Sequence, residues 1–565
     1  MRRIARAVVS CALLPLLLAA APAWDPAPWL ADLGQIRTAI DRDYPNRDWL
    51  TVEREVSLDR WFDRAAGAIR ASRNDADARR VLDRLIERFK DGHLALHWPA
   101  ARDVAPPPTN AAPATPMSVS AFCATRGFDA GQVSAGTAAA LPGYRGIDGG
   151  GPFRAGLVST DASRAGASIG VIRIGVFSPQ GYPALCEQVV ASARIALDKP
   201  CDGGCEERLS SDVHGLMTRG LMQTVERLRA AGAQVLLVDL TRNGGGTEWA
   251  EAAARIVSPV PLRSAPIGVM RGARWVDSWR QRAAWLRKEA RHASPADRAL
   301  LINVARQADG IADGLAPCAA PSCSPLAKAG FATGPLATLP AGRLDGRTWA
   351  AGAFNAAKFP YRDSVWQGPV IVLVDDETWS AAEQFTALLQ DNDAAIVMGT
   401  RTGGAGCGHL DFDQPITLAH SGAKLEMPNC ARFRKDGSNE VGGIVPDVPT
   451  GVRWNDGPGY AARLTAGWRR RCRRRRRWQA AESDAGRKRN RATLDHADRK
   501  RNHASPLATP YPAEPRASEV IERIISTGSP PAASAAGPTS NSRWRRIASG
   551  TDPSGAIGCV ASNSS

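Results

Sequence analysis

Apolar residues in the first part of the chain follow a helical period. In residues 27–90 they recur every three or four positions in WLADLGQIRTAI, LDRWFDRAAGAI and ARRVLDRLIERF, while the other faces are charged. A helix with one apolar face must bury that face against a partner. The pattern therefore predicts an N-terminal helical domain, residues 24–99, built as a small bundle. It ends at KDGHLALHW, where the period shifts towards two.

A different pattern, strands alternating with helices, runs over residues 166–455. SIGVIRIGVF, AQVLLVDL, GPVIVLVD and AAIVMG are apolar runs of strand length, and HGLMTRGLMQTVERLRAAG, TEWAEAAARIV and SAAEQFTALLQD have helical character. Continuously apolar strands are typical of a parallel sheet covered by helices. We therefore predict an α/β core with a mainly helical insertion at about 260–365. Residues 100–165, rich in Pro, Ala and Gly, are predicted to be a linker with short strands.

The net charge of the chain is concentrated at its C-terminal end. Of the formal +16, residues 461–565 hold 21 Lys+Arg and 8 Asp+Glu, a net of +13, which leaves +3 for residues 1–460. Residues 456–565 contain RRRCRRRRRW and a stretch that cannot bury a core, so we predict a disordered Arg-rich tail. Arginines could hold anionic lipid or nucleic acid, but a solvated tail is favoured, and no nucleic-acid binding by the core is expected.

The N-terminus and the cysteines both indicate export. Residues 1–23 combine three arginines, the apolar AVVSCALLPLLLAA and a small-residue APA, which predicts a signal peptide and a secreted, periplasmic protein. Eight of the eleven cysteines lie outside the signal and the tail, an even number that favours disulfides. The proposed pairs are Cys201/Cys205, Cys318/Cys323, Cys407/Cys430 and Cys123/Cys186. Zinc is the alternative for CDGGC, but no second motif completes a site, so neither a metal nor a cofactor is predicted.

Two stretches in the α/β region could carry chemistry. VLVDDETWSAAEQF (372–385) crosses from a buried strand into a helix at Ser380, and VLLVDLTRNGGGTEW (235–249) runs from a strand into three glycines. SAAE fits a capping box, in which Ser380 has only a structural role. Yet helix starts at strand ends also stabilise negative charge and form active sites in α/β sheets. The glycines lack the phosphate-loop pattern, which leaves a tight turn or an oxyanion hole.

Taken together, four motifs resemble one family. LLVDLTRNGGG, VIVLVDDETWSAAE, GTRTGGAGCG and EVGGIVPDV occur in the order seen in the tail-specific or C-terminal processing peptidases, whose relatives include the tricorn protease core and the retinoid-binding repeats of photoreceptor matrix. FKDGHLAL resembles the segment that closes the helical domain in these proteins. The resemblance covers roughly residues 166–452. It implies a ClpP/crotonase-like sheet-and-helix core and serine peptidase activity on peptides or unfolded protein segments.

The family has two catalytic designs, and the residues choose between them. In the processing peptidases a lysine 25 residues after the serine is the base, but that position here is Ala405. In the tricorn-like design a histidine from the upstream domain is the base, and a glutamate before the PD motif supports it. His93 in DGH and Glu440, seven residues before Asp447, match that design. The resemblance thus implies Ser380 as nucleophile, His93 as base and Glu440 as its partner.

Several alternatives remain open. The expected oxyanion donors are the N–H of Ala381 and that of one glycine among residues 244–246, with Gly245 as the first choice. The tricorn type has a serine before its histidine, whereas this chain has Gly92, so the relay is either shorter or bridged by water. His409 is a rival base, and His93 could be merely structural. No carboxylate-binding loop of the PDZ type is evident in residues 100–165. The competing function is a non-catalytic protein that binds a peptide or apolar ligand on the same fold.

Overall fold

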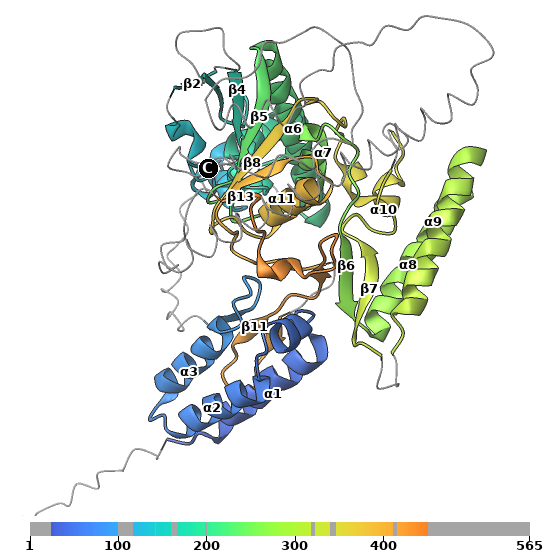
Figure 1. Ribbon diagram of the computed structural model, residues 1–565. Coiled ribbons are helices and arrows are strands. Elements are labelled where there is room, and N and C mark those ends of the chain that lie inside the picture. The colour runs from blue at the N-terminus through green and yellow to red at the C-terminus, as the bar shows by residue number, and fades with distance from the viewer. Residues whose placement is uncertain are drawn as a thin grey trace, which may run out of the picture.

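The computed structural model describes residues 24–99, 117–141, 143–147, 149–159, 168–197, 201–317, 323–339, 346–410 and 415–449. The predicted signal peptide, residues 100–116 of the predicted linker and the predicted Arg-rich tail lie outside the described residues. Figure 1 shows a helical domain, an α/β core and an insertion that carries two long helices. No helix within the described ranges is both long and apolar enough to cross a membrane.

The helical domain contains the three predicted helices. They are α1 (Ala27–Asp43), α2 (Leu58–Arg70) and α3 (Asp75–Glu87), with a short π-helix at Trp49–Glu53. Ser57 and Asn74 cap α2 and α3 by accepting a backbone N–H of the first turn, the usual role of these residue types. The apolar faces meet in one core that fully buries Ile36, Ile69 and Leu82.

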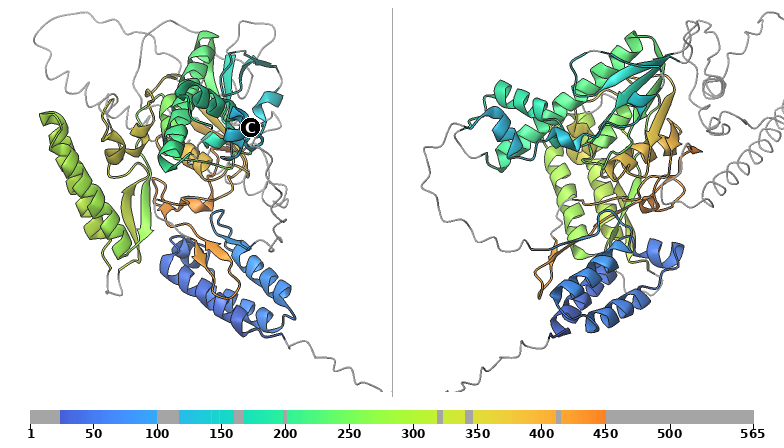
Figure 2. Two further views of the ribbon diagram at one scale, coloured as in Figure 1. Left: turned by 180° about the vertical axis from the view of Figure 1, so that it is seen from behind. Right: turned by 90° about the vertical axis from the view of Figure 1, so that its left-hand side faces the viewer.

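A distant segment completes this domain. β1 (Ala95–His97) pairs with β11 (Lys424–Glu426), which also pairs with β10 (Ile416–Thr417), both antiparallel. Leu418 and Leu425 are buried in the same core as the helices. The carboxylate of Asp32 on α1 accepts the N–H groups of His420 and Ser421. Figure 2 shows these strands against the helices. The helical domain is therefore tied to the core by a second crossing, which the boundary 24–99 omits.

The core is a seven-stranded sheet in the order β13-β9-β8-β5-β4-β3-β2. Its first five strands are parallel, and β3 and β2 are added antiparallel. The strands are β2 (Tyr144–Gly146), β3 (Ala155–Ser159), β4 (Ser168–Arg173), β5 (Ala233–Asp239), β8 (Val370–Val374), β9 (Ile396–Gly399) and β13 (Val448–Pro449). The α/β prediction is thereby confirmed.

One face of the sheet bears most of the helical cover. Ile172, Leu236 and Val372 point into a large core shared with the helices, whereas Val171 and Leu237 point to a smaller cluster on the other face, as the two-residue period of a strand requires. The helices are α4 (Val119–Ala124), α5 (Pro183–Ala193), α6 (Gly203–Ala230), α7 (Trp249–Val257) and α11 (Ala381–Asp391). α4 was not predicted, because residues 100–165 show few periodic runs.

The insertion combines a helical pair with a small sheet. Its elements are β6 (Pro266–Met270), α8 (Ala273–Ala290), α9 (Pro295–Gly314), β7 (Leu326–Phe331) and α10 (Ala350–Ala353). β6 pairs antiparallel with β7 and with β12 (Ala431–Arg432), which follows β11 in the chain. Figure 1 shows α8 and α9 packed side by side next to this sheet. The insertion is thus joined to the C-terminal part of the core.

Three of the predicted disulfides are formed. They link Cys123 to Cys186, Cys201 to Cys205 and Cys407 to Cys430. Cys323 is also disulfide-bonded, while Cys318, its predicted partner, lies outside the described residues.

Candidate active site

Ser380 occupies a strained turn between β8 and α11. Its φ of 53° and ψ of −115° lie in a region that side-chain-bearing residues rarely adopt and that concentrates at functional sites. Ser380 is also the N-cap of α11, in a capping box with Glu383, whose carboxylate accepts the Ser380 N–H at 3.0 Å. The capping interpretation and the chemical one are therefore compatible, because the same turn caps the helix and presents the hydroxyl.

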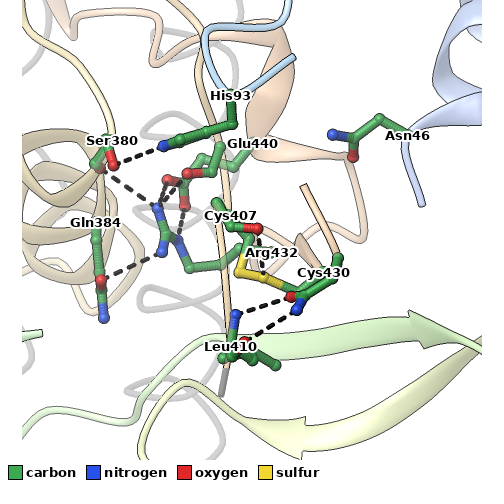
Figure 3. Close-up of a disulfide and its surroundings, with 12 residues drawn as sticks. Asn46, His93, Ser380, Gln384, Cys407, Leu410, Cys430, Arg432 and Glu440 are labelled. Carbon is green, nitrogen blue, oxygen red and sulfur yellow. Dashed lines mark hydrogen bonds and ion pairs between the residues drawn. A yellow bond between two sulfur atoms is a disulfide. The ribbon is translucent and has the colours of Figure 1, made fainter. Parts of the chain in front are cut away.

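The hydroxyl of Ser380 faces a histidine from the helical domain. Ser380 Oγ lies 3.0 Å from His93 Nε2 (Figure 3). His93 Nδ1 lies 2.9 Å from the carbonyl oxygen of Ala405. A carbonyl oxygen only accepts, so Nδ1 carries the proton in the neutral ring. Nε2 is then unprotonated and accepts from the serine hydroxyl. This tautomer can take the serine proton.

A buried aspartate fixes the turn that carries His93. Asp91 Oδ1 accepts the His93 N–H at 3.0 Å, and Oδ2 accepts from Tyr44 Oη at 2.9 Å and Asn46 Nδ2 at 2.8 Å. Burial raises the pKa of Asp91, and these donors oppose that shift. Asp91 was not among the predicted site residues, although an aspartate two positions before the candidate base indicates a side-chain turn of this type. The turn that carries His93 is thus held by the loop that follows α1.

Glu383 connects the serine turn to the segment that orients His93. Besides the Ser380 N–H, its carboxylate accepts the N–H groups of Gly404 at 2.9 Å and Ala405 at 2.8 Å, and the hydroxyl of Thr402 at 2.5 Å. Burial raises the pKa of Glu383, while these donors oppose the shift. The carboxylate of Glu383 therefore fixes both the turn that carries Ser380 and the segment whose Ala405 carbonyl faces His93. The capping-box motif pointed to Glu383, but only as a structural residue.

The environment of His93 favours the neutral form of its ring. Burial lowers the pKa of His93 below the ordinary value, and the charge of Asp91 and the bond to the Ala405 carbonyl only partly offset that effect. An imidazole that acts as a base must be unprotonated before the reaction. His93 therefore stays competent as a base at a pH below the usual range for histidine.

Comparison with known proteins gives a family match for the part of the chain that contains Ser380. Residues 208–450 match peptidase family S41. An uncharacterized protein of Chlamydia muridarum (strain MoPn / Nigg) is 53% identical over 88 residues, which are 16% of this chain and 14% of that protein. The chain thus spans only a small part of the length of this relative.

Solved structures with a similar course of the chain are distant in sequence. Mature CPAF complexed with lactacystin is 15% identical, with a TM-score of 0.47, over 75% of this chain and 94% of that one. A putative peptidase from Parabacteroides merdae ATCC 43184 is also 15% identical, with a TM-score of 0.39, over 77% and 92% of the two chains. The tricorn protease is 11% identical, with a TM-score of 0.26, over 75% and 34%.

The residues that match the S41 model include Ser380, Gly245, Ala381 and Glu440, whereas His93 lies outside them. The histidine that faces Ser380 therefore comes from the helical domain. The position of His93 depends on the contacts between this domain and the core, among them Asn439 Nδ2 donating to Asn46 Oδ1 at 2.8 Å.

Glu440 has a different partner from the one predicted. Its oxygens accept from Arg432 Nε at 2.8 Å and Arg432 Nη2 at 2.5 Å (Figure 3), while His93 Nδ1 faces Ala405. A guanidinium offers two charge-assisted donors in a fork, so it outcompetes a single neutral imidazole N–H for a buried carboxylate. Arg432 in turn donates to the Gly406 carbonyl at 3.0 Å and to Gln384 Oε1 at 3.2 Å. Glu440 thus supports the loop beside the base rather than the base itself.

The two expected oxyanion donors differ in their environment. Ala381 begins α11 and lines the cleft, where a first-turn N–H has no helical partner. The Gly245 N–H donates to Asn243 Oδ1 at 2.9 Å, and Gly246 lines the cleft instead. Gly245 is still required sterically, because its φ is +109° and an added Cβ would lie 2.7 Å from the Cβ of Ser380.

Trp379 explains why glycine precedes His93. An added Cβ at Gly92 would lie 2.6 Å from the Trp379 ring, and one at Gly403 would lie 2.2 Å from its Nε1. The indole therefore occupies the space beside Gly92 in which a serine side chain would stand. His409, the rival base, packs edge-on against His93 with ring centroids 5.9 Å apart, and its Nε2 lies 3.2 Å from a Glu426 oxygen.

Two further histidines, His214 and His420, have structural surroundings. His214 is buried, and its ring nitrogens contact the Ser210 carbonyl and the Thr247 hydroxyl. His420 packs edge-on against Trp29. Within the described ranges, no three His, Cys, Asp or Glu side chains are grouped to hold a metal ion.

Proposed function

We propose that this protein is a serine peptidase that cleaves peptides or unfolded protein segments, with Ser380 as nucleophile and His93 as general base. The observation that carries the proposal is the 3.0 Å contact between Ser380 Oγ and His93 Nε2, with the opposite ring nitrogen held by a carbonyl. The S41 match over residues 208–450 supports the same reaction class.

In this reaction the Ser380 oxygen attacks the peptide carbonyl while its proton passes to His93 Nε2. The imidazolium then protonates the leaving amine, and the acyl group remains on Ser380. In the second half, His93 takes a proton from water, and the water oxygen attacks the acyl carbon. Release of the acid restores both side chains.

Backbone groups support the charges that develop. The Ala381 N–H, together with the N–H of Gly246 in the cleft lining, is suited to hold the oxyanion, and loss of one such donor typically costs about 3 kcal/mol of barrier. The Ala405 carbonyl accepts the Nδ1 proton throughout, and the carboxylate of nearby Asp91 favours the transient imidazolium. Glu440 acts through Arg432 and the Gly406 carbonyl.

A fluorophosphonate probe tests the proposal directly, since it reacts with activated serines. We expect the full chain to be labelled, Ser380→Ala to abolish labelling, and His93→Gln to slow it strongly. Ser364→Ala is a matched control, because Ser364 also has a positive φ of 52° and lies outside the cleft lining. A folded wild-type chain that takes no label and hydrolyses no unfolded casein would contradict the assignment and favour a non-catalytic binding protein.

We also propose that the protein is exported and works in an oxidising compartment such as the periplasm. The three disulfides support this location. N-terminal sequencing of the protein from a periplasmic fraction should begin at Trp24. Recovery of the uncleaved chain in the cytoplasm with free thiols would contradict it.

A further inference from the structure

The cleft at Ser380 continues along one helix of the insertion. A cavity of about 940 Å³ is lined by Ser380, Ala381 and His93 and also by Trp275, Trp279 and Trp285 of α8. The three tryptophans fall on one side of the helix. Arg280 and Arg287, on the other side, pair with Asp309 of α9. The insertion thus presents an aromatic wall, Trp275/Trp279/Trp285, to the same space as the nucleophile.

The rings of this wall are held in place. Trp285 remains 37% exposed, yet its ring rests on the backbone of α10, where a Cβ added at Gly352 would lie 2.0 Å from it. Trp279 is buried behind it, with the Arg282 guanidinium 5.3 Å from its ring centroid, and Arg282 Nη1 donates to the Gly352 carbonyl at 3.3 Å. The exposed part of the fixed Trp285 ring favours binding of apolar groups, because covering it removes apolar surface from water.

The charged side chains of the cleft are engaged within the protein. Lys358 pairs with Glu248, Arg432 pairs with Glu440, and Arg282 contacts Trp279 and the Gly352 carbonyl. A charged substrate side chain would have to displace one of these contacts. An aromatic or large aliphatic side chain would only displace water from the tryptophans.

We propose that the α8 aromatic wall is a substrate subsite that binds an aromatic or large aliphatic side chain of an extended peptide whose scissile bond lies at Ser380. The proposal rests on the peptidase function proposed above and adds the class of side chain selected. The cavity joins the wall to the nucleophile without interruption, which favours the substrate chain itself as the occupant. The subsite makes α8 a specificity element of this chain.

Binding to a hydrolysis-deficient chain tests the subsite apart from catalysis. In Ser380→Ala, fluorescein-labelled twelve-residue peptides with three Phe, three Ser or three Glu at matched positions are titrated by fluorescence polarisation. We expect the Phe peptide to bind at least tenfold more tightly than the others. Adding Trp285→Ala should reduce that ratio below threefold, whereas Trp285→Phe should keep most of it. Trp61→Ala, a half-buried tryptophan on α2, is the matched control and should leave the ratio unchanged.

The outcomes separate the subsite from the enzyme. If Phe selectivity requires Trp285 but the wild-type chain takes no fluorophosphonate, the subsite stands and the peptidase function fails. If the wild-type chain is labelled but Phe and Ser peptides bind alike, or Trp285→Ala leaves the ratio intact, the subsite is wrong. Gly352→Ala, which displaces the Trp285 ring without removing it, should weaken Phe binding in the same way. Unchanged binding in that variant would also count against the wall.

Discussion

Removal of the Cys407–Cys430 disulfide should lower turnover about tenfold, beyond any effect on stability. Cys407 lies two residues after Ala405, whose carbonyl holds His93, and Cys430 lies two residues before Arg432 (Figure 3). The disulfide therefore ties the segment that orients the base to β12. Without it, hydrogen bonds such as the one from the Asn429 N–H to the Gly408 carbonyl hold that end of the segment, and the carbonyl opposite Nδ1 should move more freely.

The stabilisation expected from this disulfide can be compared with that of a second disulfide in the same chain. For loop closure, the chain-entropy relation gives about 3.4 kcal/mol for the sequence separation of 23 between Cys407 and Cys430. It gives about 4.3 kcal/mol for the separation of 63 between Cys123 and Cys186. The second disulfide should thus stabilise the fold more, although it joins α4 to α5 away from Ser380. A tenfold loss of turnover corresponds to about 1.4 kcal/mol of barrier.

The assay compares Cys407→Ala/Cys430→Ala with Cys123→Ala/Cys186→Ala. Unfolding midpoints in urea are measured first, and kcat is then measured at a temperature where both variants are folded. We expect the 123/186 variant to lose more stability but to keep its kcat. The 407/430 variant should lose less stability, yet its kcat should fall about tenfold. If kcat falls in both variants in proportion to the loss of stability, the positioning role of the disulfide is refuted.

Three further predictions concern the residues around the base. Glu440→Gln should destabilise the fold by about 3 kcal/mol, because it leaves the charge of Arg432 buried and unpaired. The pH midpoint of kcat/KM should stay unchanged, and a shifted midpoint would instead mean that Glu440 acts on His93. Gly92→Ser should lower activity through a clash with Trp379, and Trp379→Ala in the same chain should restore part of it; no rescue would contradict the steric account. The acidic limb of the kcat/KM profile, which reports protonation of His93, should lie below pH 6.5 because burial lowers that pKa; a limb at or above 6.5 would contradict the burial effect.

Much of the architecture followed from patterns that depend on local chemistry. Helical spacing of apolar residues identified α1, α2 and α3, because an amphipathic face must be buried wherever the helix lies. Continuous apolar runs identified β5 and β8, since buried parallel strands need apolar side chains on both faces. The order of the motifs singled out Ser380 and His93, which the structure places within hydrogen-bonding distance. The packing of residues 416–427 against the helical domain could not be predicted, because β10 and β11 are too short to show a periodic pattern of apolar residues.

The sequence by itself determined which side chains could react. Ser380 carries a hydroxyl and His93 an imidazole, and both lie within recognisable motifs. Only the tertiary structure decided how they are supported. Every residue has a backbone carbonyl, so the sequence does not identify the carbonyl of Ala405 as the acceptor for His93. Likewise, Glu440 could pair with any donor near it, and packing brought the guanidinium of Arg432 there. Competition among buried donors and acceptors is settled by distance in the folded chain, and this quantity is absent from a one-dimensional pattern.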